Sequence, residues 1–429
     1  DMRFRQWRNK LLDYEYWNCI DEIPDHRFWS LRQELKSQML SATCKRTLQR
    51  CKRNKCNENL TRRITRNMIE AETDILVLGF ARRFATYKRA TLLFRDPQRL
   101  ARLLNDEKRP VMLIFAGKAH PKDNPGQDLI RAIHEFANRP EFLGKIILLE
   151  GYNMAMARNL VAGVDVWVNT PEYPLEASGT SGQKAAINGA LNLSVLDGWW
   201  GEGFNGKNGW GISPHDSNTS PEVRDHEEAN DLLDILEHEI IPIFYNRGNQ
   251  GYSKEWVKLS KESMKSCIPK FNASRMVMDY VKNLYSPATI HYKKLKQDNS
   301  APAKELASWK AKIKKHWHNI NIERLDHAAS SINDGEALTV KVKALLNGLS
   351  PDDVAIECVV DTPHGNDDLT IFEKPQYFMF EYSGVQDGQH IFSLDLQQLN
   401  SGINFYKIRI YPYHRLLAHP LETGYMVWL

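Results

Sequence analysis

Short, continuously apolar runs begin after Asp74 and alternate along the chain with segments of helical periodicity. Such runs are typical of strands that are buried on both faces of a sheet. They occupy residues 75–80, 111–116 and 146–149, and two mostly apolar segments follow at 164–168 and 193–196. Amphipathic segments such as 97–104 separate most of them, and this alternation predicts an α/β domain with a parallel sheet and right-handed crossovers.

From about residue 332 the pattern changes to a period of two, which is typical of antiparallel strands. It is clearest at 338–343 and 406–410, so the C-terminal part predicts an antiparallel β-sandwich. Helical patterns precede it, and 297–302 carries the best linker signal. We expect four regions: a helical N-terminal segment (1–72), the parallel-sheet domain (73–298), a helical connector (299–331) and the β-sandwich (332–429).

Composition narrows the class of protein. The 429 residues are 42% hydrophobic and 26% charged, which is typical of a globular protein of two to four domains. A net charge of +4 does not favour nucleic acid as a partner, and no apolar run reaches the ~20 residues of a membrane span. Six cysteines are too few for a disulfide scaffold, so we expect a cytoplasmic protein with neither nucleic acid nor membrane as partner.

The N-terminal segment is strongly basic and carries Cys44, Cys51 and Cys56. Its cations are Lys45, Arg46, Arg50, Lys52, Arg53, Lys55, Arg62, Arg63 and Arg66. Zinc or nucleic-acid binding is one interpretation, but the cysteine spacing matches no paired zinc motif. A solvated helix face with cysteines as small core residues is the other, and we favour it. His316 and His318 could be a metal-binding pair, but a turn of a surface helix is the interpretation that we favour. We therefore expect no metal site.

Cations gather where the first strands end. The segment RRFATYKR (82–89) follows the first run and contains four cations, and Gly117 and Lys118 follow the second. In parallel sheets, ligands bind at the carboxyl ends of the strands, and arginine and lysine there suit an anion such as phosphate. The alternative is an exposed first turn of a helix.

The third loop is the most specific. EASGTSGQK (176–184) is a run of small residues that opens a helix, and backbone N–H groups at such a start can cradle phosphate. Its spacing is not that of a nucleotide P-loop. Lys184 lies about one turn inside the helix, where a lysine either reaches solvent or serves as a reactive amine. A phosphate cradle beside a part-buried lysine fits pyridoxal phosphate.

These segments together resemble the glycogen/α-glucan (maltodextrin) phosphorylases. EASGTSGQK (176–184) with NGA (188–190) resembles the family's pyridoxal-phosphate segment, and RRFATYKR (82–89) resembles its phosphate-site segment. GKA (117–119) and EGY (150–152) fall in the expected order between them. LDGWWGEG (196–203) and NGKNGW (205–210) point to the bacterial-type branch.

The resemblance implies pyridoxal 5'-phosphate as cofactor. Lys184 would bind the cofactor's aldehyde as a Schiff base, Thr180, Ser181 and Gly182 would hold its phosphate, and Tyr152 would lie near its ring. The cofactor phosphate would exchange a proton with the substrate phosphate. Inorganic phosphate would then attack an α-1,4-glucan end and give α-glucose 1-phosphate with retention.

The resemblance also implies substrate contacts. Arg83 and Lys88 would hold the substrate phosphate and offset its repulsion by the cofactor phosphate. The residues that would contact the terminal glucose are Glu176, Ser178, Gly179 and Tyr87. Three departures affect the cofactor environment: Arg82 stands where many members have Lys, Asn153 stands where the better-known branch has Arg, and Gln183 stands where Met is usual.

The motifs belong to the C-terminal one of the family's two Rossmann-like domains. We therefore expect this chain to be the C-terminal half of the enzyme and to be inactive alone. Its expected partner is the N-terminal half, and the sequence does not determine the number of copies in an oligomer. Two rival functions remain: a nucleotide-sugar-dependent retaining glucosyltransferase, and a non-catalytic glucan-binding or assembly module. In the second rival, Tyr377, Phe378 and Tyr382 of the β-sandwich would stack on sugars, although alternate ones would be core.

Overall fold

The computed structural model describes residues 6–69, 74–215, 219–326, 338–361, 375–396 and 405–429. The chain divides into two compact units, Asp1–Val277 and Met278–Leu429. The boundaries expected near residues 72, 298 and 331 stay predictions. None of the helices in the described part of the chain has both the length and the apolar character that crossing a membrane requires.

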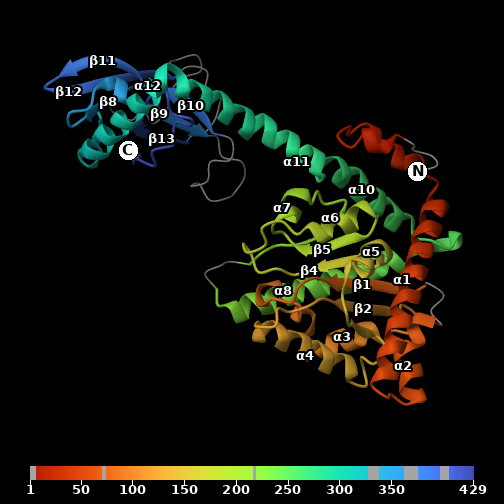
Figure 1. Ribbon diagram of the computed structural model, residues 1–429. Coiled ribbons are helices and arrows are strands. Elements are labelled where there is room, and N and C mark those ends of the chain that lie inside the picture. The colour runs from red at the N-terminus through yellow and green to blue at the C-terminus, as the bar shows by residue number, and fades with distance from the viewer. Residues whose placement is uncertain (1–5, 70–73, 216–218, 327–337, 362–374, 397–404) are drawn as a thin grey trace. The chain divides into compact units, whose positions relative to one another are not determined.

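The first unit is built around a six-stranded sheet with the order β3-β2-β1-β4-β5-β6, in which every neighbouring pair is parallel (Figure 1). The strands are β1 (Leu76–Ala81), β2 (Val111–Ala116), β3 (Ile146–Leu149), β4 (Val166–Asn169), β5 (Leu191–Val195) and β6 (Gly209–Ile212). The five apolar runs are confirmed as β1 to β5, and all residues of these strands are buried. The sequence analysis did not predict β6.

Helices cover both faces of this sheet. They are α1 (Asp25–Arg53), α2 (Glu58–Ile69), α3 (Pro97–Leu104), α4 (Asn124–Asn138), α5 (Met154–Gly163), α6 (Thr180–Ile187), α7 (Trp199–Gly203), α8 (Pro221–Ile235), α9 (Ile241–Tyr245) and α10 (Lys254–Lys270). α11 (Ala273–Tyr280) spans the boundary between the two units.

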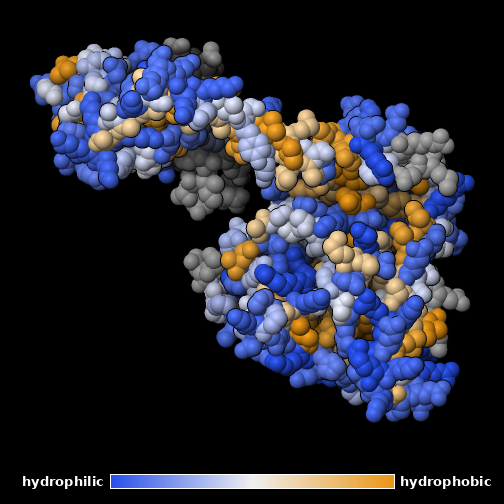
Figure 2. All heavy atoms as spheres, viewed as in Figure 1, coloured by the Kyte–Doolittle hydropathy of each residue, from blue (hydrophilic) through white to orange (hydrophobic). Residues whose placement is uncertain are grey.

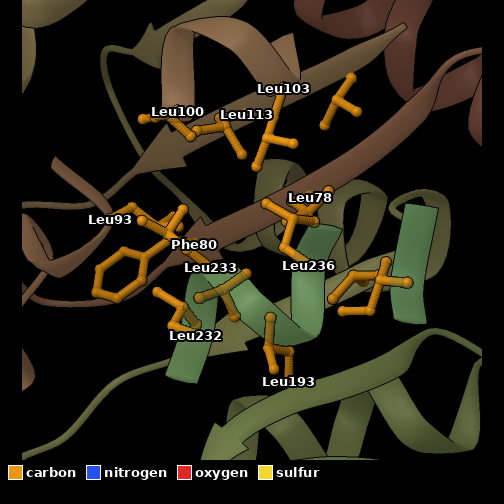
Figure 3. Packing of buried hydrophobic residues seen from close by; sticks show 14 of the residues in the cluster. Leu78, Phe80, Leu93, Leu100, Leu103, Leu113, Leu193, Leu232, Leu233 and Leu236 are labelled. Atoms are coloured by element: carbon orange, nitrogen blue, oxygen red, sulfur yellow. The ribbon is translucent and has the colours of Figure 1, made fainter. Parts of the chain in front are cut away.

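Side chains of β1 alternate between two hydrophobic cores, one on each face of the sheet. Leu78 and Phe80 pack toward Leu232, Leu233 and Leu236, as Figure 3 shows. On the other face the core is formed with α1, α2 and α5. Strands that are buried on both faces have no polar alternation, which explains why β1, β2 and β3 are continuously apolar.

The N-terminal helix α1 is tied to the sheet by a buried ion pair. Lys36 Nζ lies 2.6 Å from a carboxylate oxygen of Asp165 and donates a hydrogen bond to the Ile75 carbonyl at 3.0 Å. Asp165 in turn accepts from the Val77 backbone N–H at 2.9 Å. Cys44 and Cys51 of α1 are buried in the same core, as expected of small core residues.

The second unit is an antiparallel β-sandwich, as predicted. One four-stranded sheet has the order β10-β9-β13-β14 and the other the order β11-β12-β8-β7. The strands are β7 (Asn321–Arg324), β8 (Leu338–Leu345), β9 (Val354–Asp361), β10 (Gln376–Met379), β11 (Glu381–Gln386), β12 (Gln389–Leu396), β13 (Phe405–Pro412) and β14 (Val427–Trp428).

Helix α12 (Ser286–His316) precedes the sandwich. Its backbone leaves the helical conformation from Gln297 to Ser300, within the predicted linker. Beyond this break Trp309 and Ile313 pack into the sandwich core. The surface of this unit is largely hydrophilic in the view of Figure 2.

Candidate active site

The carboxyl ends of β1 and β4 lie side by side, although two strands separate them in the sequence. Leu78 pairs with Val166, and Gly79 pairs with Trp167. The strand order reverses here, because β2 and β3 extend to one side of β1 while β5 and β6 extend to the other side of β4. Open α/β sheets bind ligands at such a switch point. The loops that leave β1 and β4 therefore form the candidate active site.

Glu176, from the loop after β4, faces two cations from the loop after β1. Its carboxylate accepts a hydrogen bond from Lys88 Nζ at 2.8 Å and another from Arg82 Nη2 at 3.3 Å. All three side chains are at least nine-tenths buried. One carboxylate cannot neutralise two cations, so this cluster retains a net positive charge in a desolvated position.

The Arg82 guanidinium is incompletely satisfied. Its Nε is buried and has no hydrogen-bond partner among the described residues. Burial lowers the pKa of Arg82, while the Glu176 carboxylate acts in the opposite direction. A buried donor without a partner costs free energy, which an acceptor such as a phosphate oxygen would recover.

The loop after β1 is held in place by its fourth cation. Arg89 has a positive φ of 43° and is buried. It donates to the Thr170 carbonyl at 3.1 Å, the Pro171 carbonyl at 2.7 Å and Asp225 at 2.8 Å, and it also pairs with Glu228. Of the four cations that the sequence analysis grouped as an anion site, Arg89 is thus held by two carboxylates, which gives it a structural role.

Gly117 brings two loops together, as a close backbone approach requires. A Cβ added at this position would lie 2.0 Å from the Arg82 carbonyl oxygen. The Phe84 backbone N–H donates to the Lys118 carbonyl at 3.0 Å. The close approach at Gly117 is therefore to the loop after β1, and the Lys118 side chain is exposed.

Helix α6 begins after Gly179, whose φ is +92°. A Cβ added to buried Gly182 would lie 2.7 Å from Asn192 Oδ1 and 2.9 Å from Trp199 Nε1, so this glycine lets α6 pack closely. Thr180 and Lys184 are exposed. Lys184 was expected either to reach solvent or to serve as a reactive amine, and the part-buried position that would suit the cofactor is wrong, because Ala185 and Ala186 form the buried side of the helix.

The remaining predicted residues differ in their exposure. Tyr152, half-buried after β3, donates to the Ala81 carbonyl at 3.4 Å, and burial raises its pKa. The ring of Tyr87 lies 4.5 Å from Lys88 Nζ. Arg83 and Ser178 are exposed, whereas Ser181 is half-buried. The structure thus gathers Lys88, Glu176, Tyr87 and Tyr152 around the ends of β1 and β4, and the roles assigned to these residues stay predictions.

Asp197 was missed by the sequence analysis as a site residue. Its carboxylate accepts from the Glu176 backbone N–H at 2.9 Å and from the Gly198 N–H at 2.8 Å. It thereby fixes the backbone that carries Glu176. An Asp–Gly pair directly after an apolar run is a turn signal that could have indicated this role.

Comparisons with known proteins find family models and relatives that match most of the chain. Residues 14–200 match the family model described as "Carbohydrate phosphorylase", and residues 317–429 match that of the "Glycogen phosphorylase C-terminal domain". Maltodextrin phosphorylase of Thermococcus litoralis is 39% identical over 429 residues, which cover 99% of this chain and 49% of that protein. Glycogen phosphorylase of Mycobacterium tuberculosis (strain H37Rv) is 37% identical over 422 residues, 95% of this chain and 47% of that protein. The chain spans about half the length of these relatives.

Proposed function

The chain belongs to the carbohydrate phosphorylase family, and on this premise we propose that the intact protein cleaves α-1,4-glucans with inorganic phosphate, releasing α-glucose 1-phosphate with retention. The observation that carries this proposal is the cluster of Arg82, Lys88 and Glu176 at the switch point of the sheet. It offers a desolvated excess of positive charge, which is what a reacting phosphate needs.

Arg83 and Lys88 would bind the substrate phosphate. Lys88 is rigidly placed, because Arg89 next to it is anchored to Thr170, Pro171 and Asp225. Arg83 is exposed and presents a guanidinium that can bind two phosphate oxygens at once. When phosphate enters, Lys88 would exchange part of its interaction with Glu176 for the new anion.

The terminal glucose would be held by Glu176, Ser178 and Gly179, with Tyr87 beside it. A carboxylate that already accepts from Lys88 keeps lone pairs for a sugar hydroxyl. The Asp197 side chain would keep this loop in position, since it binds the Glu176 backbone N–H. Water exclusion around these groups would strengthen each electrostatic contact.

The residues present fit pyridoxal 5'-phosphate as the cofactor. Lys184 offers an exposed amine, the first turn of α6 offers Thr180, Ser181 and Gly182, and Tyr152 would lie near the ring. Arg82 Nε, which finds no acceptor within the part of the chain that the structure describes, suits a phosphate oxygen. When bound, pyridoxal phosphate supplies a phosphate group that exchanges a proton with the substrate phosphate. A nucleotide-sugar-dependent glucosyltransferase, the rival with a similar sheet, has no use for the Lys184 amine.

The test is glucose 1-phosphate release from maltoheptaose and phosphate by the protein at its natural length. Arg83→Ala should lower kcat/KM for phosphate roughly tenfold to a hundredfold, because a charge-assisted hydrogen bond contributes ~1.5–3 kcal/mol. Lys122→Ala, which removes an exposed cation from another loop, is the matched control and should leave the phosphate dependence unchanged. An Arg83→Ala protein with normal phosphate dependence would contradict the assignment.

A further inference from the structure

One face of the sheet β10-β9-β13-β14 carries an unusual set of side chains. Residues of β13 alternate along the strand, and Ile408 and Ile410 point into the sandwich core. Arg409 therefore lies on the opposite face. The strand register places Met379, Glu357, Arg409 and Trp428 in one row across all four strands of this sheet.

Arg409 is surrounded by aromatic rings. Its guanidinium carbon lies 5.7 Å from the centre of the Tyr377 ring, 5.7 Å from that of Tyr411 and 5.1 Å from that of Trp428. Glu357 pairs with Arg409 and also accepts a hydrogen bond from the Tyr411 hydroxyl at 3.1 Å. These five residues, Tyr377, Glu357, Arg409, Tyr411 and Trp428, form what we call the aromatic face.

Two of the three rings are about half exposed to solvent. Tyr377 is 56% exposed and Trp428 is 49% exposed, whereas Tyr411 is 5% exposed. The centres of both exposed rings lie within 5.7 Å of the Arg409 guanidinium carbon, so the two rings are neighbours on this face. The buried Tyr411 helps to hold Arg409 and Glu357, and the exposed rings flank this centre.

We propose that the aromatic face binds an α-1,4-glucan chain. Sugar rings have apolar C–H faces that stack on aromatic rings, and hydroxyl edges that bond to planar charged groups such as carboxylate and guanidinium. Glu357 and Arg409 neutralise each other, so this central pair carries no excess charge for an anion, and the nearest further cation of β13 on this face is the exposed Lys407. A neutral, hydroxyl-rich ligand fits this combination of groups.

A protein partner fits less well. A stable protein interface buries on the order of 800 Å² per partner with an apolar centre. Here the centre is an ion pair, and the exposed large side chains on and next to its row include Tyr377, Met379, Tyr413, Trp428 and Leu429. Among the aromatics expected to stack on sugars, Phe378 packs against the sandwich core instead, and Tyr382 lies on the other sheet.

This inference rests on the proposed function for the identity of the glucan. A polymer whose end reacts at one site has further glucose units available for a second contact on the same protein. Such a second contact raises the effective concentration of the chain end without any change at the reacting site. The aromatic face would therefore favour long glucans over short maltooligosaccharides.

The experiment measures retention of the 429-residue chain by amylopectin in native gels, together with co-sedimentation with glycogen. Tyr377→Ala and Trp428→Ala should each weaken binding roughly fivefold, which is the scale of one aromatic contact. Tyr382→Ala is the matched control, since it removes a 47% exposed tyrosine from the other sheet, and it should bind as the parent does. Both target rings are about half exposed, so we expect the two variants to unfold at the same midpoint as the parent. If Trp428→Ala does not fold, the glucan binding of Tyr377→Ala alone tests the proposal.

Parent-like retention of the Tyr377→Ala protein would overturn the proposal. The proposal would also be overturned if Tyr377→Ala changed the oligomeric state in size-exclusion chromatography but left glucan retention unchanged. That result would show that the aromatic face is an interface between copies of the chain. Phosphorolysis of maltoheptaose, assayed separately in the natural-length protein, should be unaffected by Tyr377→Ala. The natural-length protein could form no glucose 1-phosphate while the variants still bind glycogen more weakly than the parent. The proposed function would then be wrong, and the proposal that the aromatic face binds glucan would still hold.

Discussion

The Lys88 ammonium group donates a hydrogen bond to the Glu176 carboxylate across 2.8 Å, and both side chains are buried. This contact joins the loop after β1 to the loop after β4, at the place where the strand order reverses. The Arg82 guanidinium contacts the same carboxylate. Glu176 is therefore both the counter-ion of the cation cluster and a candidate sugar ligand.

Glu176→Gln should destabilise the fold by about 3–5 kcal/mol, the usual cost when one partner of a buried ion pair is removed. The loss leaves Lys88 and Arg82 without a counter-ion. Inorganic phosphate should then recover part of the stability, because an anion that binds only the folded state raises its unfolding midpoint. Thermal unfolding with increasing phosphate measures both effects.

Asp165→Asn is the control for this experiment. It also removes the carboxylate of a buried pair, with Lys36, but that pair lies where α1 meets the sheet, away from the loops after β1 and β4. Phosphate should raise the midpoint of Glu176→Gln more than that of Asp165→Asn. Equal gains would mean that phosphate acts through general salt effects and that the cluster does not bind it.

Lys184→Ala should abolish the near-ultraviolet absorbance of bound pyridoxal phosphate, and it should change the free energy of unfolding of the cofactor-free protein by less than about 0.5 kcal/mol. The stability effect is small because the Lys184 side chain is exposed. After borohydride treatment, peptide mapping should find the cofactor on the peptide that contains Lys184.

Lys118→Ala serves as the control for cofactor retention, since Lys118 is also an exposed lysine in a loop that leaves a strand of the same sheet. It should keep the absorbance. A cofactor that is fixed on another lysine would refute the role of Lys184.

Local pattern was sufficient for much of this fold. Strands β1, β2 and β3 are apolar throughout because both of their faces are buried, and the period of two in β8 and β13 follows from one buried face. Strand β6 was missed because Gly209 and Gly211 dilute its apolar character. A Cβ at Gly209 would lie 2.7 Å from the Asn192 carbonyl, and one at Gly211 would lie 2.6 Å from Leu196, so packing between distant segments requires both glycines.

The same limit applies to the candidate active site. The sequence indicates that cations follow β1, but only the fold shows that Arg89 turns toward Asp225 and Glu228 while Lys88 turns toward Glu176. The exposure of Lys184 likewise depends on which side of α6 packs against its neighbours. Residue type and spacing identify the segments that form the site. Tertiary contacts determine which of their side chains face the site and which have a structural role.

Gly182→Ala should destabilise the first unit by roughly 1–3 kcal/mol, as overpacking of a tight contact does. The added methyl group would lie 2.7 Å from Asn192 Oδ1 and 2.9 Å from the Trp199 indole nitrogen. Gly201→Ala is the matched control, because its nearest contact is an ordinary 3.4 Å. Urea unfolding of both variants checks this expectation, and an unchanged midpoint for Gly182→Ala would show that α6 can shift freely.

The buried pair of Lys36 and Asp165 should make stability depend on pH in the alkaline range. Burial lowers the pKa of Lys36 to about 8, although the Asp165 carboxylate acts in the opposite direction. In the unfolded chain this lysine has a pKa of about 10.4. Between these values the unfolded chain binds more protons than the folded one, so the free energy of unfolding rises with pH. The contribution is complete above the unfolded pKa and is lost as pH falls toward 8.

In the parent, the titration of Lys36 should raise the free energy of unfolding by an amount on the order of 3 kcal/mol across this pH window. Lys36→Met removes this titration, so the free energy of unfolding should depend less on pH between about 8 and 10. The readout is the slope, because the variant also removes the cation that pairs with Asp165 and is less stable at every pH. Lys258→Met, which removes an exposed lysine of α10, should keep the parent slope. Urea unfolding at several pH values measures all three proteins, and parallel curves for the parent and Lys36→Met would show that Lys36 titrates normally in the folded protein.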